Sequence, residues 1–358
     1  MNTYTNNMTK TERVAYGLRE LYENYGYAQY RMSKFEEYDL YVRNKSFLLS
    51  DHIITFTDID GKLMALKPDV TLSIVKSTTD TESGMRKVYY NENVYRVPKG
   101  SLSFKEIMQT GLECIGELDG YSVYEVLMLA AKSLGEISDD FVLDISDIGI
   151  LTSLIDSMNI DREGKARLFE AIGEKNTYAI DAICREYDVA SKERDALLSL
   201  VSMKGDPQEM LEILKNTECA DEAERLFEII SLLKKTFGNR IRADFSVIND
   251  TRYYNGIVFK GFIKGIPTSV LTGGRYDSLM SRMGKKSGAI GFAVYLDLID
   301  ELDDVADEFD CDVFLLYSAR TPISVISEKI DLLLKSGKRV KSGKEIAPGL
   351  RYKELIEI

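Results

Sequence analysis

The 358-residue sequence contains a single histidine, His52. Histidine is the usual general base near neutral pH and a common metal ligand. Its scarcity therefore argues against Ser-His-Asp, Cys-His and histidine-metal chemistry. His52 lies in an apolar-alternating stretch, 48–58, where we expect a packed or hydrogen-bonded imidazole rather than a catalytic one. We leave it out of the candidate site.

Cysteines and long apolar runs are also scarce. The four cysteines, at positions 114, 184, 219 and 311, show no Cys-x-x-Cys spacing, so neither a disulfide framework nor a zinc site is indicated. No run approaches the eighteen or so apolar residues of a membrane span, and the first residues lack the basic and apolar regions of a signal peptide. These absences predict a cytoplasmic protein with reduced thiols and without a metal or other cofactor.

An excess of positive charge is missing as well. Lys and Arg number 46 against 58 Asp and Glu, which gives a net charge of −12. A chain of this charge has no global attraction for nucleic acid. Its hydrophobic content of 44% and charged content of 29% are ordinary for a globular protein, and its length suffices for two or three domains.

Hydrophobic spacing and β-branched runs predict an α+β core. Helices are expected over 9–25, 72–77 and 123–134. Strands are expected over 27–32, 53–58, 63–66, 87–97 and 106–115, and they should form a largely antiparallel sheet. Apolar residues then recur at helical spacing over about 147–237, which indicates a helical insertion.

A second β-rich block follows the insertion, with strands expected over 241–248, 257–263, 268–271 and 288–294. We therefore expect the interrupted sheet to resume there and the core to span 1–308. Residues 309–358, with a strand over 312–317 and a helix over 322–334, form a short α/β segment, near the lower size limit of an independent domain.

Two polar patterns lie at the ends of predicted elements. Asp69 and Thr71 follow Pro68 at the start of a helix, where they could cap the helix or accept hydrogen bonds from a ligand ammonium. Arg96 ends a strand before a Pro/Gly loop, where a planar guanidinium suits a carboxylate or phosphate, although an arginine in such a position is by itself more often a solvated surface residue.

Two further patterns lie on strands. The period of two places Gln109, Gly111 and Glu113 on one face, either beside a ligand or on the exposed face of an edge strand. Tyr253-Tyr254 and Gly273-Gly274 could wall a pocket around a flat ring, or form a glycine bulge with core tyrosines.

Taken together and in this order, the four patterns resemble the catalytic core of histidyl-tRNA synthetase, a class II aminoacyl-tRNA synthetase, over about 9–302. Gln109-x-Gly111-x-Glu113 is similar to the synthetase's amino-acid-receiving Gln-x-Gly-x-Glu. The resemblance implies an antiparallel sheet flanked by helices, with the α-amino or carboxylate end of histidine near Asp69, Thr71 and Gln109. The implied histidine-binding residues are Asp69, Thr71, Arg96, Gln109, Glu113, Tyr253 and Tyr254.

The departures from the synthetase fall on groups needed for adenylation. Its Gly-x-Glu-Arg motif is replaced by Tyr295-Leu296-Asp297-Leu298, and its Arg-Gly-Leu-Asp motif by 249–252. Losing preorganised positive charge at a phosphoryl-transfer site costs several orders of magnitude in rate. No catalytic residue is therefore assigned, and the chain is not expected to be an enzyme.

The chain keeps the histidine-binding residues of the synthetase, lacks its adenylation arginines and has a truncated C-terminal segment. In this combination it resembles the regulatory-subunit family of ATP phosphoribosyltransferase, the first enzyme of histidine biosynthesis. That resemblance implies a short-form catalytic subunit as partner, a class II-type dimer within a hetero-oligomer, and L-histidine as feedback effector. The effector could sit in the synthetase-like pocket or at the interface with the catalytic subunit. The alternative is an active minimal synthetase that adenylates histidine with Arg96 and a relocated Arg252. Binding to tRNA or to a membrane is not expected.

Overall fold

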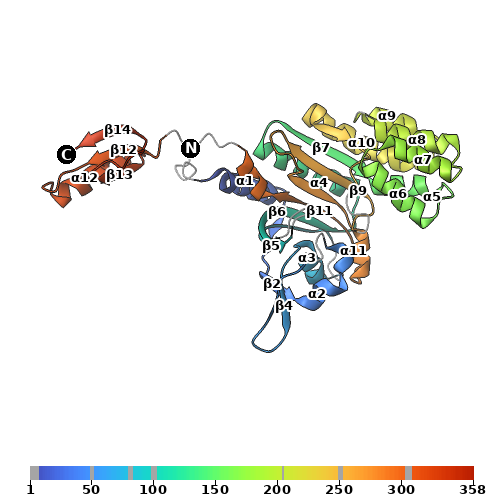
Figure 1. Ribbon diagram of the computed structural model, residues 1–358, viewed down its shortest axis with the longest axis horizontal. Helices are drawn as coiled ribbons and strands as arrows, with labels where there is room; N and C mark the ends of the chain where they lie inside the picture. Colours follow the sequence, from blue (N-terminus) through green and yellow to red (C-terminus); the bar gives the residue numbers. More distant parts are fainter. Residues whose placement is uncertain are drawn as a thin grey trace. The chain divides into compact units, whose positions relative to one another are not determined.

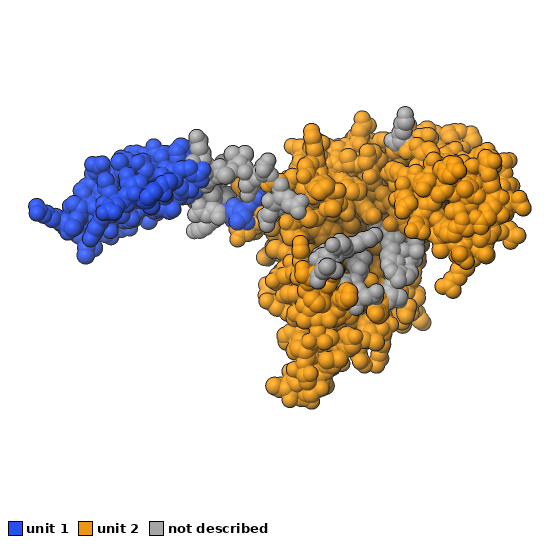
Figure 2. All heavy atoms as spheres, in the orientation of Figure 1, with its two compact units in different colours: residues 1–10, 303–358 blue, residues 11–302 orange. Residues whose placement is uncertain are grey.

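The computed structural model describes residues 8–48, 52–79, 84–97, 103–203, 205–248, 253–302 and 309–358. The chain divides into two compact units (Figures 1 and 2). The larger comprises residues 11–302, and the smaller comprises residues 303–358 with 1–10. The larger unit contains two β-sheets and the smaller unit contains one.

An eight-stranded sheet forms the centre of the larger unit, in the order β1-β5-β6-β11-β10-β9-β7-β8. Its strands are β1 (Ala28–Gln29), β5 (Arg86–Arg96), β6 (Lys105–Gly116), β7 (Phe141–Asp147), β8 (Ile241–Ala243), β9 (Ile257–Ile263), β10 (Leu271–Arg275) and β11 (Gly288–Tyr295). All interior pairs are antiparallel, which confirms the expected sheet, while the two outermost pairs are parallel.

Helices α1 (Lys10–Asn24) and α4 (Gly120–Ile137) cover one face of this sheet (Figure 1). The i, i+4 spacing of Val14, Leu18 and Tyr22 places all three in the core. The Tyr22 hydroxyl is hydrogen-bonded to Ser133 Oγ of α4 at 2.9 Å. Burying each such side chain contributes about 1.5–3 kcal/mol, so packing holds both helices on the sheet.

The opposite face of the sheet carries a second hydrophobic core. Tyr89 and Tyr90 show the alternation, since Tyr89 packs with α1 and α4 whereas Tyr90 packs with the second core. This second core includes α2 (Tyr38–Arg43), α3 (Thr71–Ser77) and α11 (Asp277–Arg282). A small antiparallel sheet, ordered β2-β4-β3, adjoins them. Its strands are β2 (Phe35–Glu37), β3 (Thr55–Thr57) and β4 (Leu63–Leu66).

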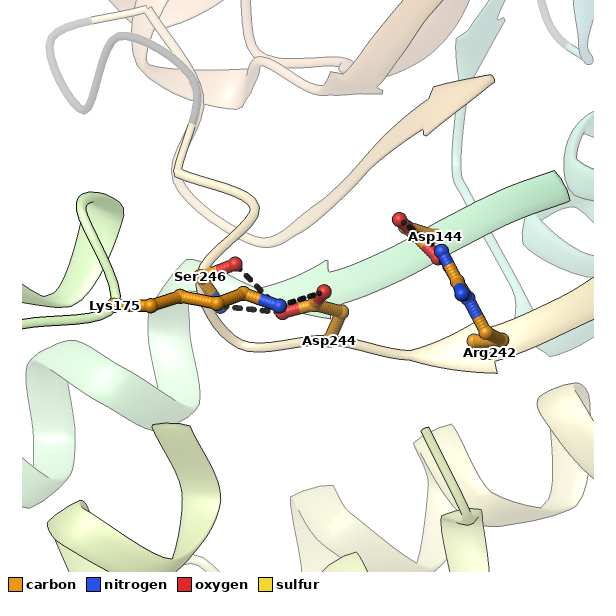
Figure 3. A network of polar contacts seen from close by, with 5 residues as sticks. All are labelled: Asp144, Lys175, Arg242, Asp244 and Ser246. Carbon is orange, nitrogen blue, oxygen red and sulfur yellow. Dashed lines mark hydrogen bonds and ion pairs between the residues drawn. The ribbon is translucent and has the colours of Figure 1, made fainter. Parts of the chain in front are cut away.

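The expected helical insertion separates β7 from β8. It comprises α5 (Ile148–Asp156), α6 (Arg162–Gly173), α7 (Thr177–Glu186), α8 (Ser191–Ser202), α9 (Pro207–Leu214) and α10 (Ala220–Phe237). Two ion pairs lie at the junction (Figure 3). Arg242 of β8 donates two hydrogen bonds to Asp144 of β7, at 2.7 and 3.0 Å, and Lys175 pairs with Asp244 at 2.7 Å. The first pair joins the two strands that flank the insertion, and the second joins the turn between α6 and α7 to the segment that follows β8.

Several strand boundaries differ from expectation. The strand expected over 241–248 ends at Ala243, because the Asp244 carboxylate accepts both the N–H and the hydroxyl of Ser246 and turns the chain. The strand expected over 268–271 instead spans Leu271–Arg275, and that over 27–32 shrinks to Ala28–Gln29. β7 was not predicted.

The smaller unit contains a parallel sheet in the order β13-β12-β14, with one helix. Its elements are β12 (Cys311–Leu316), α12 (Ile323–Lys335), β13 (Val340–Gly343) and β14 (Tyr352–Glu357). β12 and α12 match the expected strand and helix, whereas β13 and β14 were not predicted. Within the described part of the chain, we find no helix with the length and apolarity that crossing a membrane requires.

Candidate functional site

A pocket lies on the α3 side of the central sheet. All seven residues implied to bind histidine line it. They are Asp69, Thr71, Arg96, Gln109, Glu113, Tyr253 and Tyr254. The structure thus brings together side chains from β5, β6, the start of α3 and the segment before β9. Their function as a histidine site remains a prediction.

Glu113 lies at one end of this pocket and is 2% exposed. The Thr71 hydroxyl donates to its Oε1 at 2.7 Å, and the Tyr276 hydroxyl donates to its Oε2 at 2.6 Å. β6 lies between β5 and β11, so the alternative of an exposed edge strand is wrong. Gln109, on the same face, is also buried.

Burial dominates the electrostatics of Glu113. It raises the pKa of this carboxyl to about 8; the Thr71 and Tyr276 hydroxyls oppose the shift, and the nearby Asp69 carboxylate adds to it. In the empty pocket, Glu113 is therefore largely protonated at neutral pH. A ligand that brings a cationic or strongly donating group would favour the ionised form.

Asp69 makes the capping contact and also lies where it could accept a ligand's hydrogen bond. Its Oδ1 accepts the backbone N–H of Leu72 in the first turn of α3 at 2.8 Å, as a helix-capping side chain does. The carboxylate also lines the pocket. Burial raises its pKa, while the Leu72 N–H and the positive charge of Arg96 act in the opposite direction.

Arg96 is 8% exposed, so the alternative of a solvated surface arginine is wrong. It ends β5, and its guanidinium lies over the ring of Tyr295 at 5.7 Å from the centroid. Among the described residues that line the pocket, Arg96 is the only one with a cationic side chain. It is therefore the group there that can pair with a ligand carboxylate.

Three tyrosines form an aromatic wall. The Tyr253 ring lies 4.6 Å from that of Tyr254 and 5.7 Å from that of Tyr276, measured between centroids. Tyr254 is held close to β10 because position 274 is glycine: a Cβ there would come 2.5 Å from Tyr254 Cδ1. β10 pairs without interruption on both sides, so the alternative of a glycine bulge is wrong. Tyr253 is 7% exposed and lies in the core, as that alternative had it, while it also lines the pocket.

Sequence reasoning missed Tyr90, Tyr276 and Tyr295, which also line the pocket. The Gly-Gly-Arg-Tyr-Asp run was a signal for Tyr276, whereas nothing local to the sequence marked Tyr90. His52, left out of the site, is exposed and is not among the lining residues. Arg252, the cation of the alternative enzyme reading, lies outside the described residues.

The pocket combines hydrogen-bond acceptors at Asp69 and Glu113 with a guanidinium at Arg96. Such a set is complementary to a ligand that carries an ammonium, a carboxylate and a ring with polar hydrogens. A zwitterionic amino acid with a polar aromatic side chain has these groups. The aromatic wall supplies an apolar surface for a flat ring.

Comparison with known proteins gives one consistent result. The family model for histidyl-tRNA synthetase matches residues 3–299. The ATP phosphoribosyltransferase regulatory subunit of Caldanaerobacter subterraneus subsp. tengcongensis is 31% identical over 291 residues, covering 78% of this chain and 75% of that protein. The solved structure of an ATP phosphoribosyltransferase regulatory subunit/histidyl-tRNA synthetase from Bacillus halodurans superposes with a TM-score of 0.77 at 22% identity, over 97% of this chain and 93% of that chain.

A further solved structure is the ATP phosphoribosyl transferase (HisG:HisZ) complex from Thermotoga maritima, one chain of which superposes with a TM-score of 0.64 at 16% identity, over 81% of this chain and 98% of that one. Fold and pocket thus define a histidyl-tRNA synthetase-like protein with the class II architecture. Within that class, the chain belongs to the family of ATP phosphoribosyltransferase regulatory subunits.

Proposed function

We propose that this chain is the non-catalytic regulatory subunit that a short-form ATP phosphoribosyltransferase catalytic subunit requires for activity, and that it mediates feedback inhibition by L-histidine. Its relatives carry the name of the regulatory subunit, and the complex of Thermotoga maritima contains a chain of the same fold. The enzyme formed with the partner joins ATP to phosphoribosyl pyrophosphate. The chain described here supplies control rather than chemistry, in the cytoplasm.

The observation that carries the proposal is the buried pocket in which Glu113 is held by Thr71 and Tyr276. Glu113 and Tyr254 would receive the imidazole, whose N–H groups need acceptors. Asp69, Thr71 and Gln109 would engage the α-amino or carboxylate end. Arg96 would pair with the carboxylate.

Among the described residues that line the pocket, Arg96 is the only cation, whereas adenylation needs further positive charge. Where the synthetase motif has Glu-Arg, this chain has Asp297 and Leu298, and Leu298 packs partly buried against the hydrophobic core. A leucine side chain cannot neutralise a triphosphate. The pocket is therefore proposed to sense histidine without activating it, and its tyrosines and carboxylates would serve affinity alone.

Regulation requires that histidine bind one state of the complex more tightly than the other, since equal affinities shift no equilibrium. We propose that the subunit dimerises in the class II mode and that histidine in the pocket biases the interface with the catalytic subunit. An effector site at that interface is the competing location. Substitutions at Glu113 should alter inhibition if histidine binds in the pocket, and should leave it unchanged if histidine binds at the interface.

The test is phosphoribosyl-ATP formation by a short-form catalytic subunit titrated with this chain, with and without L-histidine. Activity that appears with the chain and falls with histidine supports the proposal. A Glu113→Gln chain should still activate but lose most of the inhibition, whereas Glu186→Gln, at an exposed ion pair with Arg167, should behave as wild type. Absence of any effect on the partner, together with histidine-dependent ATP–pyrophosphate exchange, would establish the minimal-synthetase alternative instead.

A further inference from the structure

We propose that Tyr295 restricts the pocket to free amino acids and excludes ligands that extend beyond the carboxylate, such as nucleotides and aminoacyl adenylates. The proposal deepens the function proposed above and rests on it for the identity of the amino acid. The proposed function does not itself require that longer ligands be excluded. We infer their exclusion from the position and the contacts of the Tyr295 ring.

The floor of the pocket changes abruptly along β11. Alternate residues of a strand face the same side of a sheet, so Gly291, Ala293 and Tyr295 share one face, and all three line the pocket. Gly291 and Ala293 are small and leave space above the strand. Tyr295 carries a phenol ring, which fills this space and closes one end of the pocket as a wall.

Register places this wall at a defined end. Tyr295 lies directly across from Gln109 on β6, and Gly291 lies across from Glu113. Four residues separate Gln109 from Glu113, which spans about 13–14 Å of strand at 3.2–3.4 Å per residue. Glu113 thus occupies one end of the pocket and Tyr295 the other, with a length between them that suits one amino acid.

Contacts at both sides fix the ring in this position. Its hydroxyl is hydrogen-bonded to Thr272 Oγ1 of β10 at 2.9 Å, and the Arg96 guanidinium of β5 lies 5.7 Å from its centroid. β5 and β10 flank the inner strands β6 and β11 in the sheet. A continuous row of contacting side chains, made of Arg96, Tyr295 and Thr272, therefore crosses β5, β6, β11 and β10.

Within this row of side chains, the Tyr295 ring lies against the Arg96 guanidinium, which would receive the ligand carboxylate. A free carboxylate can end at Arg96 without displacing the ring. A carboxyl group joined to a nucleotide phosphate as a mixed anhydride needs space just beyond Arg96, where the ring lies, and it has also lost the charge that Arg96 would pair with. The synthetase that the chain resembles has glycine, without a side chain, at the corresponding position of its Gly-x-Glu-Arg motif.

The experiment measures binding of L-histidine, ATP and a non-hydrolysable sulfamoyl analogue of histidyl-adenylate to the full chain by calorimetry. The variants are Tyr295→Gly and Tyr295→Ser, which remove the ring, and Tyr295→Phe, which keeps the ring and loses only the bond to Thr272. Melting temperatures verify that each variant is folded. The wild-type chain alone already gives a result, because its affinity for the analogue can be compared with that for histidine.

We expect the wild-type chain and Tyr295→Phe to bind histidine and to bind the analogue at least about a hundredfold more weakly. In Tyr295→Gly and Tyr295→Ser, the ratio of the affinity for the analogue to that for histidine should rise about tenfold or more. A wild-type chain that binds the analogue as tightly as histidine overturns the proposal, as does a folded Gly or Ser variant without gain. If the wild-type chain binds no histidine, the pocket assignment above fails, while a gain for ATP or the analogue in these variants still demonstrates exclusion by the ring.

Discussion

The Glu113 carboxylate lies over Gly291 so closely that a Cβ atom at position 291 would come 1.8 Å from Glu113 Oε2. The two residues are direct partners across β6 and β11. The same Cβ would come 2.4 Å from the carbonyl oxygen of Leu112, which belongs to the backbone and cannot rotate away. Absence of a side chain at 291 therefore creates the position that the buried carboxyl occupies.

Replacing Gly291 with alanine should consequently destabilise the fold and displace Glu113. Overpacking of this kind costs about 1–3 kcal/mol, and histidine affinity should fall with the displaced carboxyl. Gly173→Ala, at a helix end with nothing within 4 Å of the added Cβ, is the matched control and should be neutral. Urea denaturation and calorimetry check both effects. Equal stability of the two variants would show that β6 and β11 can separate at this point.

The raised pKa of Glu113 predicts a dependence of stability on pH. Between the usual value of 4.5 and the folded value of about 8, the folded state holds a proton that the unfolded state has released. The free energy of unfolding should therefore fall as pH rises, by up to about 1.4 kcal/mol per pH unit from this group. Glu113→Gln removes this titration. The free energy of unfolding of the variant should therefore rise relative to that of the wild-type chain between about pH 5.5 and about pH 7.5.

Denaturation curves at several pH values measure this difference. Glu186→Gln is the control, because hydrogen bonds from Arg167 hold the pKa of Glu186 below its usual range and it does not titrate in this window. Profiles of wild type and Glu113→Gln that run parallel would mean that Glu113 is ionised throughout.

Arg96 should determine the preference for a carboxylate. The wild-type chain should bind L-histidine more tightly than L-histidinol, which has a hydroxymethyl group in place of the carboxylate, by about tenfold or more, as expected for a buried charge-assisted pair. Arg96→Gln should bind both ligands with similar affinity, because it removes the partner of the carboxylate. Arg185→Gln, at an exposed helical ion pair, should preserve the discrimination. Retained discrimination in Arg96→Gln would assign the carboxylate to another group.

The ion pair between Asp144 and Arg242 should stabilise the junction of the helical insertion. Asp144 is 7% exposed at its side chain and accepts two hydrogen bonds from Arg242, a geometry stronger than that of an ordinary surface pair. A double-mutant cycle with Asp144→Ala and Arg242→Ala should give a coupling energy of about 1–2 kcal/mol. The exposed pair of Arg43 and Asp39 is the control and should give a smaller coupling that salt removes.

Much of this architecture was predictable because its signals are local or lie in sequence order. The strands 63–66 and 257–263 were predicted with their observed bounds, because each is an apolar or β-branched run next to turn residues. The resemblance to histidyl-tRNA synthetase, which rests on the order of four patterns, implied the seven candidate residues, and the structure places all of them on one pocket. Their individual patterns were ambiguous, because Asp69 could be read as a helix cap or as a ligand acceptor.

The missed features depend on contacts between distant segments. Gly273 and Gly274 were expected beyond the end of a strand, yet they lie inside β10, paired on both sides by β9 and β11. Neighbouring side chains and backbone atoms occupy the space that a Cβ atom would need there. β13 falls in a basic run, and only pairing with β12 makes it a strand. Tyr276 enters the pocket through its bond to Glu113, which lies 163 residues earlier. No local pattern encodes such a partner.

The Asp69 carboxylate accepts an N–H of the first turn of α3 and also lines the pocket. A ligand in the pocket should therefore affect local unfolding of α3. A ligand ammonium that holds the carboxylate in place also holds the acceptor of the Leu72 N–H, and fraying of the first helical turn becomes rarer. The amide hydrogen of Leu72 should then exchange with solvent deuterium more slowly when the pocket is filled, which makes one backbone proton a reporter of effector binding.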